Sequence, residues 1–228
     1  MSFSDLLYPD NPKRREKVIQ LQQEIYSLMS NNFRATNLLI NTINHHLHLD
    51  FPIISIQEKG TVQENCNILI NSMRNIQKEV EKIDKKLKEK LEPEAYKKLH
   101  DLNLPHEQKK ALLRLTAPII GSISTVAGIV LITLIVKGVI LTGMVVAIGT
   151  VATCGIAGLA LAVVFIGVDL IASAIMGAVE RDKLEHEISE YEKALDTFRP
   201  ASLKYQNDIF YAIIKIENIN NDVKHLQF

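Results

Sequence analysis

The chain has 228 residues, enough for one or two domains. Its 26 basic and 26 acidic residues cancel to a formal net charge of zero, which argues against the broad basic surface of a nucleic-acid-binding protein. Two cysteines exclude a disulfide-rich secreted domain, and the first residues lack the basic and apolar regions of a secretory signal. We therefore expect the charged parts of the chain to face a reducing compartment, the cytosol.

The first predicted helix begins at Asn11–Pro12, a capping residue followed by a proline at the first helical position. Core residues then recur at spacings of three and four, as in a coiled coil. The residues of this first seam are Val18, Leu21, Ile25, Leu28, Asn32, Ala35 and Leu39. Asn32 either fixes the helix register from a buried position or faces water where the seam loosens. The pattern stops near Leu49–Asp50, ahead of the helix breaker Pro52.

A second helix is predicted to start after Thr61, because Thr61 and Glu64 have the spacing of a capping box. Its seam keeps the same alternation and ends ahead of Glu92–Pro93. The residues of this second seam are Cys66, Leu69, Met73, Ile76, Val80, Ile83 and Leu87. Two shorter helical stretches are predicted to follow, over Glu94–Leu102 and His106–Leu115.

An apolar block separates this first flank from the last one. The 65 residues between Arg114 and Glu180 contain only two charged side chains, Lys137 and Asp169, and nine of the ten glycines of the chain. About 20 apolar residues in a helix cross a bilayer core, and glycine is frequent in such helices. The block is therefore predicted to be a membrane segment with room for two crossings.

A long third seam follows the block. Its residues are Leu184, Ile188, Tyr191, Leu195, Phe198, Ser202, Tyr205, Ile209, Ala212, Ile216, Ile219, Val223 and Leu226. Pro200 predicts a kink or a short break there. The sequence thus predicts an all-α protein, in which long antiparallel coiled-coil helices form a bundle with an apolar, glycine-rich membrane hairpin. Its predicted parts are the N-terminal helices (12–115), the membrane segment (116–178) and a C-terminal helix (179–228) that packs on the N-terminal helices.

The number of crossings depends on how the block divides. Lys137 and Gly138 separate uncharged stretches at Leu115–Val136 and Val139–Val168, each long enough to span. Two crossings leave both flanks on one side, where all three seams can pack together. A single crossing would use roughly Thr150–Ile171. The remaining alternative is a soluble bundle that buries the block, including a form that inserts later.

Several residues are candidates for contact with lipid or with another membrane helix. Basic residues beside a span favour the cytoplasmic face and attract anionic lipids. The predicted membrane-boundary or lipid-contact residues are Lys109, Lys110, Arg114, Lys137 and Asp169. Small residues permit close helix packing in a bilayer. The predicted packing residues are Gly155, Gly158, Ala162, Ser173 and Gly177.

The sequence carries no strong sign of catalysis. His45 and His48 share a helix face near Asp50, but two imidazoles at a helix end favour a polar terminus over a closed metal shell. Motifs for phosphate-binding loops, zinc proteases and nucleophile elbows are incomplete or missing. We therefore expect no enzyme activity, no cofactor and no metal. The expected partners are the lipid bilayer and proteins or further copies of the chain that bind through the seams, and not nucleic acid.

Four segments carry a resemblance to a known family. They are Leu7–Glu16, Glu64–Cys66, Lys90–Pro93 with Tyr96 and Leu99, and Gly177–Glu180. Through them the chain resembles the single-pass membrane and coiled-coil domain-containing proteins, from the N-terminus to about Tyr205. The resemblance implies one membrane crossing preceded by a coiled coil, and it implies no functional residue. Long helices around an apolar hairpin are also similar in plan to helical pore-forming toxins, although a shared plan does not establish function.

Three functional hypotheses follow. The first is a non-enzymatic integral membrane protein whose cytosolic coiled-coil bundle is an interaction or scaffolding module. The second is a membrane-inserting, toxin-like protein that stores an apolar hairpin within a soluble bundle. The third is a carrier that shelters lipid between its helices.

Overall fold

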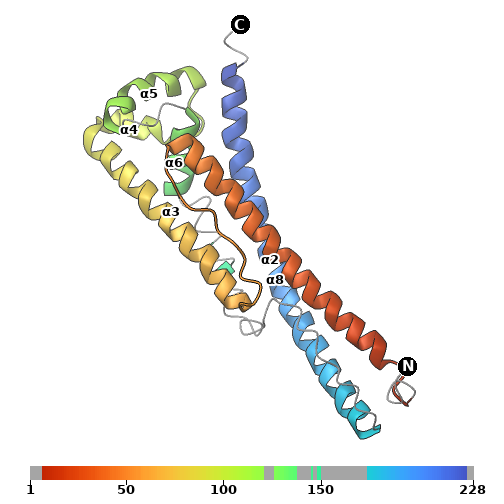
Figure 1. Cartoon of the computed structure of the whole chain (residues 1–228). Helices are drawn as coiled ribbons and strands as arrows, with labels where there is room; N and C mark the ends of the chain where they lie inside the picture. The colour runs from red at the N-terminus through yellow and green to blue at the C-terminus, as the bar shows by residue number, and fades with distance from the viewer. Residues whose placement is uncertain (1–6, 121–125, 138–144, 146–147, 150–173, 225–228) are drawn as a thin grey trace. The chain divides into compact units, whose positions relative to one another are not determined.

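The computed structural model describes residues 7–120, 126–137, 145, 148–149 and 174–224, which confirm the all-α class (Figure 1). They form the helices α2 (Asn11–Leu47), α3 (Val62–Lys90), α4 (Pro93–Leu99), α5 (His106–Ile120), α6 (Val126–Val136) and α8 (Ala174–Lys224). The chain divides into two compact units, each of which takes segments from both flanks. Unit 1 comprises Met1–Asn32, Ile56–Asn67 and Ala147–Leu203, and unit 2 comprises Phe33–Ser55, Ile68–Val146 and Lys204–Phe228.

The three seams are largely buried, as their periodicity predicts. In the first seam only Leu28 is half-buried, and its neighbour Met29 is fully buried instead. In the second seam only Ile83 is half-buried. In the third seam, Ile188 is the one half-buried residue from Leu184 to Ile216, and the later seam residues lie outside the described side chains. Because α2 carries a further buried stripe, it packs on more than one side. The residues of that stripe are Met29, Phe33, Thr36, Ile40, Ile43 and Leu47.

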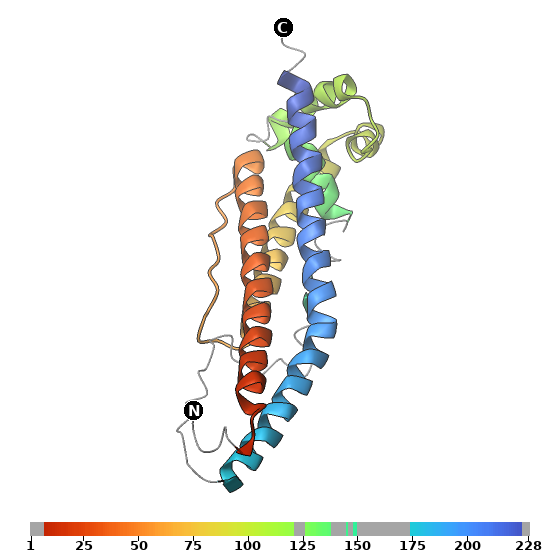
Figure 2. The ribbon, with the colours of Figure 1, turned by 90° about the vertical axis from the view of Figure 1, so that its right-hand side faces the viewer.

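Within unit 1, α2 and α8 lie side by side and run in the same direction (Figure 2). Their paired residues ascend together: Arg15 with Glu180, Gln22 with Tyr191, and Asn32 with Ser202. The same offset continues in unit 2, where Thr36 hydrogen-bonds Tyr205. The predicted antiparallel arrangement is therefore wrong for this pair, because heptad spacing is the same for both directions. The amide of Asn32 is buried and donates to the Ser202 hydroxyl at 3.0 Å. Of the two alternatives for Asn32, the buried position is therefore confirmed.

The connection from α2 to α3 explains why these helices do not form a hairpin. His48 ends α2 with a φ of 50°, in the left-handed region. Residues 49–57, here called the strap, then run back along α2 in extended form. Two asparagine side chains of α2 each bond both backbone groups of one strap residue. Asn44 pairs with Phe51 at 2.9 Å for both bonds, and Asn37 pairs with Ile54 at 2.8 and 3.0 Å.

The strap returns the chain to an earlier turn of α2 before α3 begins. In unit 1, Glu58 accepts from the Tyr26 hydroxyl, and Thr61 and Glu64 form the predicted capping box, with reciprocal bonds of 2.7 and 3.1 Å. In unit 2, Ile83 lines a cleft with Leu49, just past the end of α2. Helix α3 therefore ascends beside α2, because a long connection permits parallel neighbours whereas a short one forces antiparallel ones.

The apolar block also departs from its predicted form. The stretch Leu115–Val136 was expected to be one span, but α5 ends at Ile120 and the separate helix α6 has 11 residues. At 1.5 Å per residue α6 is about 16 Å long, roughly half the thickness of a bilayer core. Among the described residues, no helix combines the length and the apolarity that a membrane crossing requires. Pro200 produces no break, since α8 continues through it from Ala174 to Lys224.

Candidate functional site

A polar cluster in unit 2 joins the N-terminal flank to the apolar block. We call it the His100 node; its members are Asp84 of α3, Tyr96 of α4, His100 at the end of α4, Thr133 of α6 and Lys137. The Tyr96 hydroxyl donates to Asp84 Oδ2 at 2.9 Å, and His100 Nε2 lies 2.8 Å from Asp84 Oδ1. On the other side of the imidazole, Nδ1 lies 3.1 Å from Thr133 Oγ1. Lys137 Nζ donates to the His100 carbonyl at 2.6 Å.

Short-range sequence features build this node. Pro93 starts α4 at the first helical position, and His100 caps its C-terminus. Tyr96 and His100 are four residues apart and therefore share a helix face, with their rings in an edge contact at 4.7 Å. Asp84 follows Val80 by four residues and precedes Leu87 by three, so it falls within the buried stripe of α3. The sequence placed Ile83 in that stripe; the structure half-exposes Ile83 and buries Asp84.

The electrostatics of the node favour an ionised Asp84. Burial alone would raise the pKa of the Asp84 carboxyl, but the contacts from His100 and Tyr96 outweigh burial and lower that pKa below its ordinary value. Burial, followed by the hydrogen bond to the neighbouring Asp84 carboxylate and its charge, raises the pKa of Tyr96 to about 12. The Asp84 and His100 side chains are each only 11% exposed. Their 2.8 Å contact lies outside hydrogen-bond geometry, so it acts as an ion pair when the imidazole is protonated.

The hydroxyl of Thr133 fixes the role of the imidazole. Thr133 is buried and donates its proton to the Ile129 carbonyl of its own helix at 3.0 Å. Its oxygen therefore accepts from His100 Nδ1–H. His100 Nδ1 therefore binds Thr133, while Nε2, on the other side of the ring, lies beside the Asp84 carboxylate. The node thus fastens α6 to α3 and α4 through a charged, mostly buried chain of contacts.

The order threonine, histidine, aspartate resembles a nucleophile with its base and orienting carboxylate. Burial argues against that use. Thr133 is only 1% exposed, and its hydroxyl is already committed to the Ile129 carbonyl. A reacting carbonyl would need a position about 3 Å from the hydroxyl oxygen, and the surrounding residues Val126–Ile135 are all buried. The node is therefore a fastening between helices.

Comparison with known families places the node in a wider context. The model of a family described as protein of unknown function, DUF4533, matches residues 14–166, about two-thirds of the chain. The chain belongs to the DUF4533 family. The matched range contains all five residues of the node and the whole of α6. Helix α8 lies beyond it, so the DUF4533 match covers the fastened part of the block and not the helix that runs beside α2. No solved structure matches the chain.

The boundary residues predicted from the sequence have different environments in this DUF4533 protein. Lys109 is buried, and its ammonium donates to the Leu102 carbonyl at 2.8 Å, so it points into the protein. Burial lowers the pKa of Lys109. Lys110 forms a 3.3 Å ion pair with Glu107, and Arg114 is exposed. Lys137 is exposed and belongs to the node.

Of the predicted helix-packing residues, only Gly177 lies in the described part of the chain. Gly177 lies in the first turn of α8. Gly155, Gly158, Ala162, Ser173 and the predicted boundary residue Asp169 lie outside the described residues. Among the described residues, no group of three or more histidine, cysteine, aspartate or glutamate side chains has the geometry to hold a metal ion. At the end of α2 the rings of His45 and His46 make an edge contact at 4.8 Å.

Sequence reasoning missed the node itself. Asp84 carried a usable signal, because a carboxylate at heptad spacing from apolar residues calls for a buried partner. Tyr96 and His100 carried a second signal, their spacing of four on a short helix. Their meeting with Thr133, 33 residues beyond His100, depends on the packing of α6 and has no local signature.

Proposed function

We propose that this protein is a non-enzymatic, membrane-inserting helical protein whose flanks shelter the first helix of the apolar block until it meets a bilayer. The observation that carries the proposal is the burial of α6. Its first ten residues, Val126–Ile135, are all buried, and none of them is charged. A helix that is apolar on every face belongs either in a protein core or in a membrane. In this DUF4533 protein α6 occupies a core position, and the rest of the block supplies the further length that a crossing requires.

The His100 node suits storage of α6 for later release. Apolar contacts alone can hold a helix in a protein core, so polar contacts at such a helix have a further role. Here Thr133 and Lys137 tie the middle and the end of α6 to His100, whose charge partner is Asp84. When the node opens, its ionised groups return to water, while α6 exchanges one apolar environment for another. Such an exchange costs little per residue, because lipid tails are about as apolar as a protein core.

A second candidate is the constitutive membrane protein with a coiled-coil interaction module. The exposed apolar residues Phe210, Tyr211 and Ile214 of α8 favour it, since their side chains are 43–55% exposed and are available to a partner. The resemblance to single-pass membrane and coiled-coil proteins supports this candidate as well. It differs from the first in timing: the block would be in the membrane from synthesis onward.

Two measurements on the full chain separate the candidates. We expect protein expressed without detergent to be recovered in the aqueous fraction after carbonate extraction, and to release calcein from added vesicles. Asp84→Ala should release dye several-fold faster than the wild type, because the node is weakened. Glu81→Ala is the matched control, since Glu81 is an exposed carboxylate of the same helix. Protein found only in carbonate-resistant membranes would favour the constitutive candidate, and equal leakage by both variants would exclude the node as the fastening.

A further inference from the structure

We propose that a cleft in unit 2 binds the headgroup of an anionic phospholipid. This inference rests on the proposed membrane function and names the surface that first meets the bilayer. The cleft lies beside the last turns of α3, just past the end of α2, and has a volume of about 440 Å³. We call it the α3 cleft; it is lined by Leu49, Glu79, Lys82, Ile83, Lys85, Lys86 and Glu89.

The α3 cleft has an apolar part and a charged part. Leu49 and Ile83 are half-buried, and Ile83 is the one second-seam residue that the bundle does not fully cover. Around them stand three lysines at spacings of three and four, so that they project from neighbouring positions of one helix. An amphiphile with an anionic head and an apolar body matches this pair of environments.

The lysines are available to a ligand. Lys86 is exposed and forms no ion pair within the part of the chain that the structure describes. Lys82 pairs with Glu79 at 2.6 Å and Lys85 with Glu89 at 3.9 Å, all four side chains being 42–77% exposed. Exposed pairs on one helix are weak and exchange readily. A phosphate can therefore recruit these ammonium groups.

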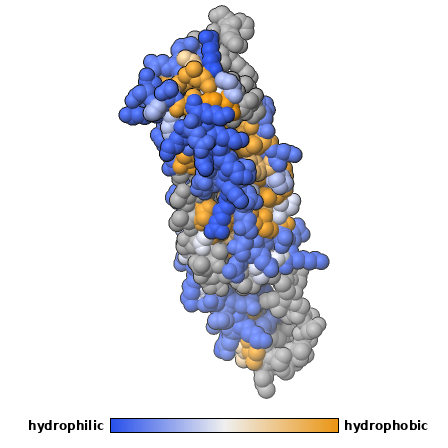
Figure 3. All heavy atoms as spheres, turned by 90° about the vertical axis from the view of Figure 1, so that its left-hand side faces the viewer, coloured by the Kyte–Doolittle hydropathy of each residue, from blue (hydrophilic) through white to orange (hydrophobic). Residues whose placement is uncertain are grey.

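The last part of α3 is basic as a whole. Residues 78–90 contain six lysines, among them the exposed Lys78, Lys88 and Lys90, against four acidic residues. The carboxylate of Asp84 is turned into the His100 node, where Tyr96 and His100 engage it. Figure 3 looks onto the side of the molecule that carries α3 in Figure 1, and hydrophilic residues cover much of that face, with hydrophobic ones between them. Basic residues near an anionic membrane surface attract it within about a Debye length.

A lipid headgroup fits better than the other anionic ligands. Free phosphate would use the lysines but leave Leu49 and Ile83 without a role. An acidic peptide without apolar side chains would likewise use the lysines and leave Leu49 and Ile83 without a role. A bilayer offers phosphates in a plane with apolar material directly beneath them. The α3 cleft offers lysines to such phosphates and has Leu49 and Ile83 beside them for an apolar part of the same lipid.

The test uses the full chain and vesicles of phosphatidylcholine with 0 or about 30% phosphatidylserine, assayed by flotation. The triple variant K82Q/K85Q/K86Q should bind the anionic vesicles roughly a hundredfold less tightly, since each lysine contributes about fivefold. K82R/K85R/K86R keeps the charge and should bind like the wild type. The matched control K59Q/K97Q/K98Q removes three exposed lysines that do not line the cleft, and it should lower the affinity for these vesicles by less than about fivefold.

The outcomes separate this inference from the proposed function. If the glutamine triple and the K59Q/K97Q/K98Q control lose equal affinity, general charge acts and the α3 cleft is excluded, while dye release per bound molecule still reports insertion. Polyglutamate tests the acidic-peptide alternative. If polyglutamate binds the wild type but not the K82Q/K85Q/K86Q variant, while both proteins bind anionic vesicles equally, the ligand is an acidic peptide and the inference is wrong. If the wild type binds anionic vesicles without releasing dye, and only the K82Q/K85Q/K86Q variant loses this binding, the cleft is supported and insertion is contradicted.

Discussion

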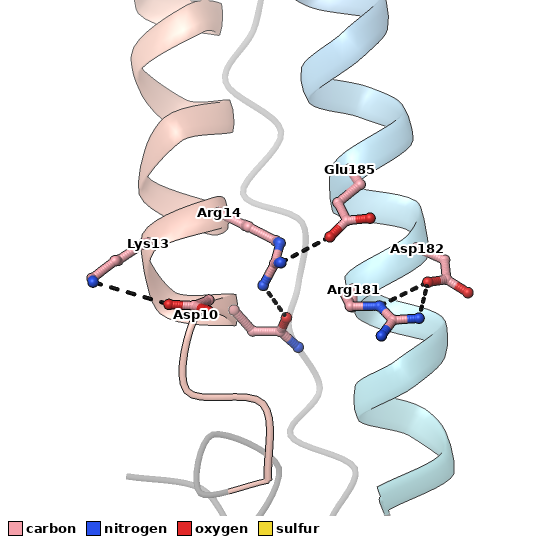
Figure 4. Close-up of polar contacts among 7 residues, drawn as sticks. Asp10, Lys13, Arg14, Arg181, Asp182 and Glu185 are labelled. Carbon is pink, nitrogen blue, oxygen red and sulfur yellow. Dashed lines mark hydrogen bonds and ion pairs between the residues drawn. The ribbon is translucent and has the colours of Figure 1, made fainter.

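Unit 1 and unit 2 use charged side chains in opposite ways. In unit 1, α2 and α8 meet along a rim of ion pairs, among them Arg14 with Glu185 at 2.8 Å and Arg199 with Glu24 at 2.6 Å (Figure 4 shows the first). The members of these two pairs are 25–52% exposed. In unit 2, Asp84 and His100 are each 11% exposed. Exposed pairs mark register at little gain, whereas a buried pair is costly to break.

The two kinds of contact differ in what happens when they open. The exposed pairs of the rim mark how α2 and α8 align, but each contributes little free energy. A buried charge without its partner must either be hydrated or disrupt its surroundings. Opening the His100 node would leave Asp84 and His100 without their partners in a mostly buried site, a cost that the exposed rim pairs do not carry. If α6 is stored for later insertion, as we propose, the His100 node is the contact that has to open.

The largest effect on stability is expected at the His100 node. Asp84→Ala leaves His100 without its carboxylate, and we expect it to lower the free energy of unfolding by about 3 kcal/mol. Glu81→Ala on the same helix should change that free energy by less than about 0.5 kcal/mol. Urea unfolding followed by circular dichroism measures both. A loss from Asp84→Ala no larger than that from Glu81→Ala would remove the distinction between node and rim.

The pH dependence of stability tests the contact between Tyr96 and Asp84 in the His100 node. The pKa of Tyr96 is raised to about 12 in the folded protein from an ordinary value of 10.0. The stability that comes from neutral Tyr96 is therefore complete below pH 10 and is lost as the pH rises towards 12. Tyr96→Phe lacks this loss, so the wild type should become less stable relative to it across that window. A difference in urea midpoints that stays constant between pH 9 and 12 would contradict the assigned contact.

The strap provides an intermediate case between node and rim. Asn44→Ala removes both bonds to the half-buried Phe51, and we expect a loss of about 2 kcal/mol. Asn41→Ala, at an exposed position one turn earlier, is the matched control and should cost less than about 0.5 kcal/mol. Hydrogen exchange should also show the amide of Phe51 losing protection only in Asn44→Ala. Equal protection in both variants would mean that the asparagine pairs do not hold the strap.

The rim should give the smallest effect. Arg15 makes a two-bond contact with Glu180 at 2.7 and 3.1 Å and is less exposed than the other rim arginines. Arg15→Ala is expected to cost about 1 kcal/mol in 50 mM salt and less in 500 mM salt, because salt screens exposed charges. Arg34→Ala, an exposed arginine elsewhere on α2, serves as control. A salt-independent loss would show that Arg15 acts through packing.

Local signals in the sequence predicted much of the fold. Heptad spacing located the long helices and most of their buried residues, and Thr61 with Glu64 marked the start of α3. Direction was not predictable, because a heptad seam reads the same in either sense and the strap has no helical signature. The strap instead depends on Asn37 and Asn44, seven residues apart, whose side-chain amides act as backbone groups. The node escaped detection because Thr133 joins it only through tertiary packing.

We propose that α6 is sheltered in protein away from membranes and passes into lipid beside them. A single cysteine at Ala127, a fully buried position, reports this in a chain whose native cysteines are replaced by alanine. We predict that this thiol resists a water-soluble maleimide before vesicles are added. After anionic vesicles that carry a photoactivatable, carbene-generating lipid are added, we predict that illumination attaches this lipid to α6, while the thiol still resists the aqueous reagent. Rapid reaction with the aqueous maleimide, or no attachment of lipid to α6, would contradict insertion.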